Sequence, residues 1–129
     1  MKRLAATVAC LALGIAPYAQ AQAPAVAPPS ADFGAVAPAL GRYEQDTVFG
    51  KLWRRPDLSR RDRSIVTLSA LIARNQGAEL PRYLGLALDN GVKPREVSEI
   101  IAHLAFYSGW PSAMTAADVL TKVLEGRAP

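Results

Sequence analysis

The chain has 129 residues, half of them hydrophobic, and a formal net charge of +4 at pH 7. This length is enough for one domain with a modest core. Lys2 and Arg3 supply two of the positive charges, so the rest of the chain is close to charge balance, and composition gives no support for nucleic-acid binding.

Residues 1–21 have the pattern of a secretory signal peptide. Lys2 and Arg3 form the charged start, an apolar run extends from Leu4 to Ile15, and Ala19-Gln20-Ala21 is a small-x-small cleavage site. Because the apolar run is short for a membrane span, an uncleaved anchor is the less favoured alternative. We therefore expect a periplasmic or secreted protein that has no membrane attachment after processing.

The only cysteine, Cys10, lies within this leader. A processed chain would therefore have no disulfide, no thiolate ligand and no cysteine nucleophile. The single histidine, His103, is too few for a conventional histidine-based metal site.

Residues 22–38 are rich in Ala and Pro and are expected to form an extended linker without chemistry of its own. Residues 39–129 are predicted to be one small all-α domain, because apolar residues recur at three- and four-residue steps and no strand-like alternation is present. The expected helices cover residues 39–52, 60–74, 79–89, 94–108 and 111–125.

Two of these helices carry apolar faces that suggest a buried position. The second begins at the N-cap Ser59 and is predicted to be central, with an apolar face of Ile65, Val66, Leu68, Leu71 and Ile72. The last helix, at 111–125, is predicted to face the core with six residues: Ala113, Met114, Ala117, Leu120, Val123 and Leu124. Its small residues permit close approach of another helix, within the domain or between subunits.

Polar groups interrupt the apolar pattern between residues 79 and 110. Glu79 and Tyr83 stand four residues apart and share a helical face. The turn at Gly91 is expected to fold the next helix back antiparallel, bringing His103 toward the same pocket. A carboxylate, a phenol and an imidazole in a partly buried pocket form a candidate proton-transfer site.

Structural interpretations stand beside these functional ones. His103 can be a buried histidine bonded to Glu99 or to a backbone carbonyl. Glu79 can complement the positive N-terminal end of its helix, and Tyr83 can be a core residue with its hydroxyl at the surface.

Two further residues have competing interpretations. Trp53 is favoured as a packing residue over a lid, because a buried aromatic contributes so much apolar area. Arg63 is favoured as a structural tie to a carboxylate such as Asp62 or Glu79, the alternative being a clamp for a substrate carboxylate.

Four segments carry a family resemblance: Arg61-Asp62-Arg63-Ser64, Glu79-Leu80, Ala87-Leu88-Asp89-Asn90-Gly91-Val92, and the run from His103 to Pro111. With them the chain resembles the carboxymuconolactone decarboxylase family, an all-helical group that also contains the alkylhydroperoxidase D-type proteins. The resemblance covers roughly the last two-thirds of the chain. It implies the same all-α fold, and assembly as a homo-oligomer, because relatives form trimers or hexamers.

The resemblance also implies a chemistry. Decarboxylases of this family act on a carboxylate-bearing lactone without a metal or organic cofactor. It implies Glu79 and His103 as proton-transfer residues and Tyr83 as an orienting or donating group. Relatives commonly have histidine at the position of Tyr83, and a phenol with a reference pKa near 10 is a poor base at neutral pH.

The function expected from these observations is cofactor-independent lyase or isomerase-like chemistry on a small carboxylate or lactone. Arg63, Trp53 and Tyr107 are the candidate substrate-binding residues. One alternative is peroxiredoxin-type antioxidant activity, which is disfavoured because the thiol mechanism of those relatives needs a Cys-x-x-Cys pair. The other is a non-catalytic periplasmic binding or assembly protein.

Overall fold

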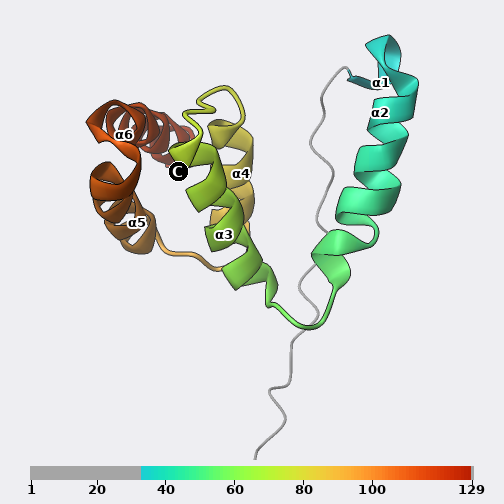
Figure 1. The fold of residues 1–129 in the computed structure, drawn as a ribbon, viewed down its shortest axis with the longest axis horizontal. Helices are drawn as coiled ribbons and strands as arrows, with labels where there is room; N and C mark the ends of the chain where they lie inside the picture. The colour runs from blue at the N-terminus through green and yellow to red at the C-terminus, as the bar shows by residue number, and fades with distance from the viewer. Residues whose placement is uncertain (1–32, 129) are drawn as a thin grey trace, which may run out of the picture.

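The computed structural model describes residues 33–128, so the predicted signal peptide, Cys10 and most of the predicted linker lie outside the described part. Within that part the chain is all-helical and has no strand, as the sequence predicts (Figure 1). Its α-helices are α1 Phe33–Val36, α2 Pro38–Tyr43, α3 Arg60–Ala73, α4 Leu80–Asp89, α5 Pro94–Ser108 and α6 Trp110–Glu125. Between α2 and α3 lie a π-helix, η1 Glu44–Phe49, and a 3-10 helix, η2 Leu52–Arg54. None of the helices described is both long and apolar enough to cross a membrane.

Helices α3 to α6 form the body of the molecule around one hydrophobic core. Helix α3 packs on α4, α5 and α6 and also meets η2, which confirms the predicted central position of this helix. The core is built from Leu68, Ile72, Leu80, Leu84, Ala87, Val92, Val97, Ile101, Ala113, Ala116 and Leu120.

Two residues predicted to face the core are exposed instead. Val66 stands two residues from both Ser64 and Leu68, which are buried, and Met114 stands two residues from the buried pair at 112 and 116. Two residues along an α-helix correspond to about 200° of rotation, so both side chains point to the opposite, solvent-facing side.

Local signals set the helix ends where the sequence places them. The Ser59 hydroxyl accepts a hydrogen bond from the Asp62 backbone N–H at 3.0 Å and donates one to the Asp62 carboxylate at 2.7 Å. Gly91 has a φ of 89°, which a residue with a side chain rarely adopts, and Pro94 opens α5. The Glu96 carboxylate caps the same helix by accepting a hydrogen bond from the Lys93 backbone N–H at 2.8 Å.

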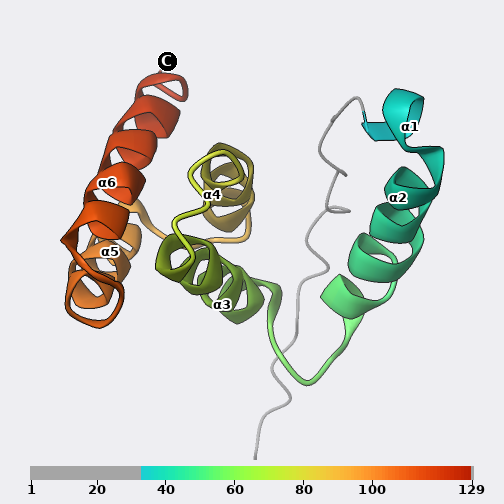
Figure 2. The same cartoon turned by 45° about the horizontal axis from the view of Figure 1, so that its top comes forward.

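The predicted antiparallel packing of the helices at 79–89 and 94–108 is wrong. Helices α4 and α5 each pack on α3 and on α6 but make no more than marginal contact with one another. Figure 2 shows α5 beside α6 and separated from α4. The reason lies in the connection: Lys93 is extended and Val92 is buried in the core, so the chain crosses to the other side of α3 instead of folding straight back.

Residues 33–54 form an arm that projects from the body beside α3 and α4 (Figures 1 and 2). The single helix predicted for residues 39–52 is divided here into α2, η1 and η2. The change to a π-helical turn alters which side of the chain faces the body. Phe49 is buried, whereas Leu40, Tyr43 and Leu52, apolar residues of the same predicted helix, are exposed.

Candidate functional site

The arm joins the body through a row of aromatic rings. Phe49 and Trp53 are both buried, and their ring centroids lie 5.8 Å apart. The Trp53 ring stacks in turn on Tyr83 of α4, with centroids 6.4 Å apart. Trp53 thus packs between arm and body, in agreement with the packing interpretation of this residue.

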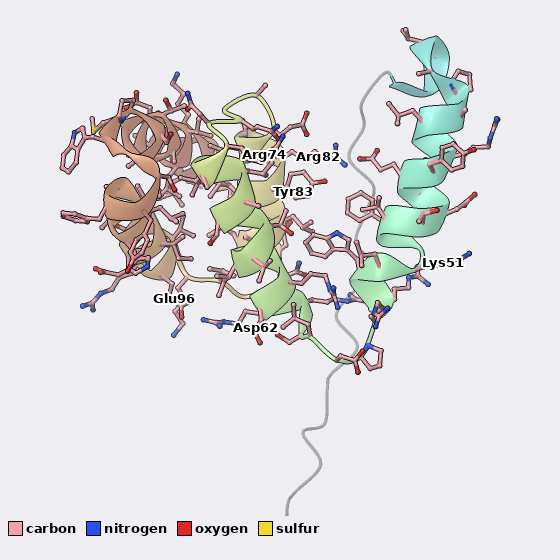
Figure 3. All side chains as sticks on the ribbon, in the orientation of Figure 1. Lys51, Asp62, Arg74, Arg82, Tyr83 and Glu96 are labelled. Atoms are coloured by element: carbon pink, nitrogen blue, oxygen red, sulfur yellow. The ribbon has the colours of Figure 1, made fainter. Side chains whose placement is uncertain are left out.

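Arg82 lies at the centre of this junction, and the sequence analysis did not single it out. Its guanidinium forms ion pairs with Glu44 of the arm and with Glu79, where Nη1 and Oε2 are 3.6 Å apart. It also lies over the rings of Phe49 and Tyr83, 5.6 and 5.0 Å from their centroids. Figure 3 shows Arg82 and Tyr83 pointing from α4 toward the arm.

We call this group of six residues the junction cluster: Glu44, Phe49, Trp53, Glu79, Arg82 and Tyr83. Glu79 and Arg82 stand three residues apart, a spacing that brings side chains together on a helix. This spacing could have predicted Arg82 as a neighbour of Glu79. The pairing of Arg82 with Glu44, 38 positions earlier, has no such local signal.

The junction raises the pKa of the Tyr83 phenol above its ordinary value. Burial is the largest cause, and the Glu44 and Glu79 carboxylates act in the same direction, while the Arg82 guanidinium opposes them. Tyr83 is therefore a neutral hydrogen-bond donor at neutral pH and not a base.

Glu79 occupies the N-cap position of α4, but its side chain makes no capping hydrogen bond. Its carboxylate is instead paired with Arg82 one turn on, and it remains partly accessible. The cluster thus combines a reachable carboxylate, a neutral phenol and a guanidinium between aromatic rings. Such a set can move a proton and hold charge.

His103 and Tyr107 lie elsewhere, exposed on α5, with their rings stacked 4.6 Å apart. The interpretation of His103 as a buried histidine is therefore wrong, and among the described residues it makes no hydrogen bond to Glu99. No hydrogen bond or ion pair joins it to Glu79 or Tyr83 in that part of the chain either. A single chain brings Glu79, Tyr83 and Trp53 together but leaves His103 and Tyr107 apart from them, because α5 does not pack on α4.

Arg63 holds the backbone that connects η2 to α3. Its Nη2 donates hydrogen bonds to the carbonyl oxygens of Arg55 at 3.2 Å and Leu58 at 3.4 Å, and its buried Nε has no partner. Within residues 33–128 it forms no ion pair with a carboxylate, so the predicted tie to Asp62 or Glu79 is wrong. The bond to Arg55, two residues after Trp53, places the positive charge of Arg63 at the base of the arm.

The all-helical fold agrees with comparisons to known proteins. Residues 38–122 match the model of the carboxymuconolactone decarboxylase family, and the chain belongs to that family. It is similar to the 4-carboxymuconolactone decarboxylase of Acinetobacter baylyi, with 36% identity over 77 residues, covering 60% of this chain and 58% of the relative. It is also similar to the nitrosuccinic acid decarboxylase of Metarhizium robertsii, with 37% identity over 76 residues, covering 59% of this chain and 53% of the relative. The chain thus spans somewhat more than half the length of these relatives.

Proposed function

We propose that the protein is a decarboxylase-like lyase that acts on a small carboxylate, with carboxylated lactones as the first candidates and without a cofactor. The names of both relatives describe decarboxylation, but of different acids. The shared chemistry therefore supports the reaction class more strongly than any one substrate. The observation that carries the proposal is the junction cluster, where Glu79 and Tyr83 lie together beside Arg82.

Decarboxylation breaks the bond between the carboxyl carbon and the rest of the substrate. CO2 leaves, the electron pair of that bond moves into the conjugated lactone, and a carbon of the substrate must then gain a proton. In this proposal Glu79 transfers that proton, and Arg82 fixes the position of its carboxylate. Tyr83 donates a hydrogen bond to the oxygen on which negative charge develops.

Arg63 is proposed to hold the substrate carboxylate. Its charge is not matched by a carboxylate among the described residues, and a guanidinium presents two parallel donors to a carboxylate. Arg82 is the weaker candidate because Glu44 and Glu79 already pair with it.

A proton-transfer role for His103 requires a second copy of the chain, because its own chain holds it away from the junction cluster. We therefore propose that the protein works as a homo-oligomer, a trimer or a hexamer, and that it does so in the periplasm or outside the cell.

A non-catalytic binding protein is the second candidate function. The favouring observation is Tyr83, whose raised pKa removes a base from a position where relatives commonly have histidine. Thiol-based antioxidant activity is not favoured, because the only cysteine of the chain lies in the predicted leader.

The two candidates are separated by a thermal-shift screen of carboxylated lactones and small carboxylic acids, followed by measurement of CO2 release for each stabilising compound. An enzyme releases CO2, and Glu79→Gln should lower the rate on the order of 100-fold, the usual contribution of a proton-transfer group. Glu125→Gln, an exposed glutamate at the end of α6, is the matched control and should keep the parent rate. Stabilisation without turnover would indicate the binding protein, and equal rates for both variants would refute the role of Glu79.

A further inference from the structure

Positive charge is concentrated at one end of the molecule. Residues 51–63 and 93–96, which we call the basal surface, contain eight Lys and Arg residues but only three Asp and Glu residues. The other residues between 33 and 128 contain five Lys and Arg residues and seven Asp and Glu residues. The basal surface therefore has an excess of five positive charges, whereas the rest of the described part has an excess of two negative charges. Both segments lie along the lower edge of the view in Figure 3, where Asp62 and Glu96 are labelled.

The fold brings the two segments of the basal surface together and holds them in place. Arg61 of α3 forms an ion pair with Glu96 of α5. Arg63 fixes the loop that precedes α3 through its hydrogen bonds to the carbonyl oxygens of Arg55 and Leu58. Helices α3 and α5 both begin at this surface, so the positive ends of their dipoles add to the side-chain charge.

The exposed side chains of the basal surface are long cations with leucines between them. Lys51, Arg54 and Arg95 are exposed, and none of them forms an ion pair among the described residues. Leu52 and Leu58 are 48% and 37% exposed. The surface thus combines positive charge with aliphatic groups that a partner can cover.

We propose that the basal surface adsorbs the folded protein onto a lipid bilayer that contains anionic phospholipids. Clusters of roughly 4–8 Lys or Arg residues are typical of such binding, and each cation near the headgroups strengthens it about fivefold. Leu52 and Leu58 can enter the boundary between headgroups and acyl chains, which favours apolar side chains flanked by cations.

A nucleic acid is the other polyanion to consider, and the aromatic residues of the surface do not favour it. Proteins that bind single strands stack the bases on exposed aromatic rings. The only aromatic residue of the basal surface, Trp53, is buried in the junction cluster. The exposed groups beside the cations are aliphatic, and these fit a lipid surface better than a base.

Adsorption of this kind needs no apolar anchor, so a chain without one after processing can still bind a bilayer. The proposal is also independent of the proposed function, because the cations replaced below take no part in the proposed reaction. CO2 release therefore tests the enzyme, and vesicle binding tests the basal surface.

Vesicle flotation measures the binding, with the secreted form of the chain and the same N-terminus in every variant, as checked by intact mass. The parent chain should float with vesicles of phosphatidylglycerol and phosphatidylcholine in equal parts, and it should not float with phosphatidylcholine alone. Raising the salt from about 0.15 M to 1 M shortens the Debye length from about 8 to 3 Å and should release the protein.

Replacement of the three exposed cations by glutamine should weaken binding to the anionic vesicles on the order of 100-fold, since each contributes about fivefold. The variant is Lys51→Gln, Arg54→Gln and Arg95→Gln in one chain. All three positions are exposed, so the variant should fold, and thermal unfolding checks this.

A matched control changes the net charge by the same amount outside the basal surface. It replaces three exposed cations: Arg42→Gln, Arg74→Gln and Lys122→Gln. This variant should bind the anionic vesicles within a few-fold of the parent chain. Equal weakening in the two triple variants would mean that net charge alone drives the binding, and this would overturn the proposal.

The leucines separate a bilayer from other polyanions. Leu52→Ser together with Leu58→Ser should weaken binding to the vesicles several-fold. A parent chain that does not float with anionic vesicles, or one that binds a short DNA duplex as tightly as it binds the vesicles, would also overturn the proposal.

Discussion

The raised pKa of Tyr83 makes the free energy of unfolding depend on pH in the alkaline range. Its pKa in the folded chain is raised, chiefly by burial, above the reference value near 10. The folded state therefore keeps the proton that the unfolded state releases. The resulting stability is complete below about pH 10 and is lost as the pH rises through the folded pKa.

Tyr83→Phe should remove this alkaline dependence of the free energy of unfolding. Urea unfolding between pH 8 and about 11, the range around the tyrosine pKa, measures the change. Tyr43→Phe is the control, because Tyr43 is exposed on the arm and should leave the alkaline dependence in place. If the slope persists in Tyr83→Phe, the shifted group is another residue.

Arg82 and Glu44 should be energetically coupled, because their paired side chains are only 18% and 22% exposed. Arg82→Met or Glu44→Gln leaves a partly buried charge without its partner, at a cost of about 2 kcal/mol each, below the range for fully buried pairs. The double variant should lose about 1–2 kcal/mol less than the sum of the two.

A double-mutant cycle by urea unfolding measures this coupling, with the exposed pair Arg55 and Asp57 as the control. That pair should show less than about 0.5 kcal/mol. Equal coupling in the two cycles would mean that the junction contributes nothing beyond a surface ion pair.

At the scale of the element, the π-helix η1 ends at a glycine that has no room for a side chain. A Cβ built on Gly50 would lie 2.5 Å from the Asp46 carbonyl oxygen and 2.8 Å from that of Gln45. Gly50→Ala must therefore shift the backbone that positions Phe49 and Trp53, at a cost of about 1–3 kcal/mol.

Fluorescence of Trp53 measures this shift. Emission should move to longer wavelength in Gly50→Ala, because the buried indole gains water, while the other described tryptophan, Trp110, is exposed already. Gly126→Ala is the control, since a Cβ there meets only ordinary contacts, the nearest at 3.5 Å. An unchanged spectrum in Gly50→Ala would show that η1 does not position the tryptophan.

The ion pair between Arg61 and Glu96 joins α3 to α5 and predicts part of the acid limit of stability. The pKa of Glu96 is lowered, first by the Lys93 backbone N–H and then by Arg61. The stabilisation is present above the unfolded pKa of about 4.3 and is lost as the pH falls through the folded value.

Glu96→Gln should therefore flatten the loss of stability below about pH 5, as measured by thermal unfolding across that range. Glu99→Gln, exposed on the same helix, should leave it unchanged. The prediction fails if the two variants lose stability with acid to the same extent as the parent chain.

The elements also show which parts of the fold a sequence reveals. Ser59, Gly91 and Pro94 could be interpreted correctly, because helix caps and turns depend on residues within a few positions. Helical periodicity predicted the core-facing side of α3, apart from Val66. The choice of partner for α5 could not be predicted, because it depends on the direction of a short connection and on competition between α3, α4 and α6.

In the candidate site, too, contacts between residues close in sequence could be predicted and contacts between distant segments could not. Glu79 and Tyr83 share a helical turn, and their proximity follows from spacing alone. Glu44 reaches Arg82 only because the arm folds back at its base, a contact between segments distant in sequence. The position of His103 was predicted wrongly for the same reason that the packing of α4 and α5 was.

At the scale of the whole molecule, the predicted signal peptide implies a mature chain that begins at Gln22 and contains no cysteine. The intact mass of protein recovered from the periplasm measures this. Ala19→Leu together with Ala21→Leu removes the small residues of the cleavage site and should leave an unprocessed chain. A mature parent species that retains Cys10 would contradict both the location and the exclusion of thiol chemistry.

The π-helix of the arm has a consequence for how this chain can change over evolution. Its wider turn holds one residue more than an α-helical turn would need. Loss of a single codon there would restore α-helical winding and rotate Leu40 and Tyr43 by about 100° relative to the fixed Phe49 and Trp53. One small deletion could thus present a different surface to the outside while the anchor stays intact. Related lineages that differ by one residue at this turn are therefore expected to differ in which side chains their arms expose.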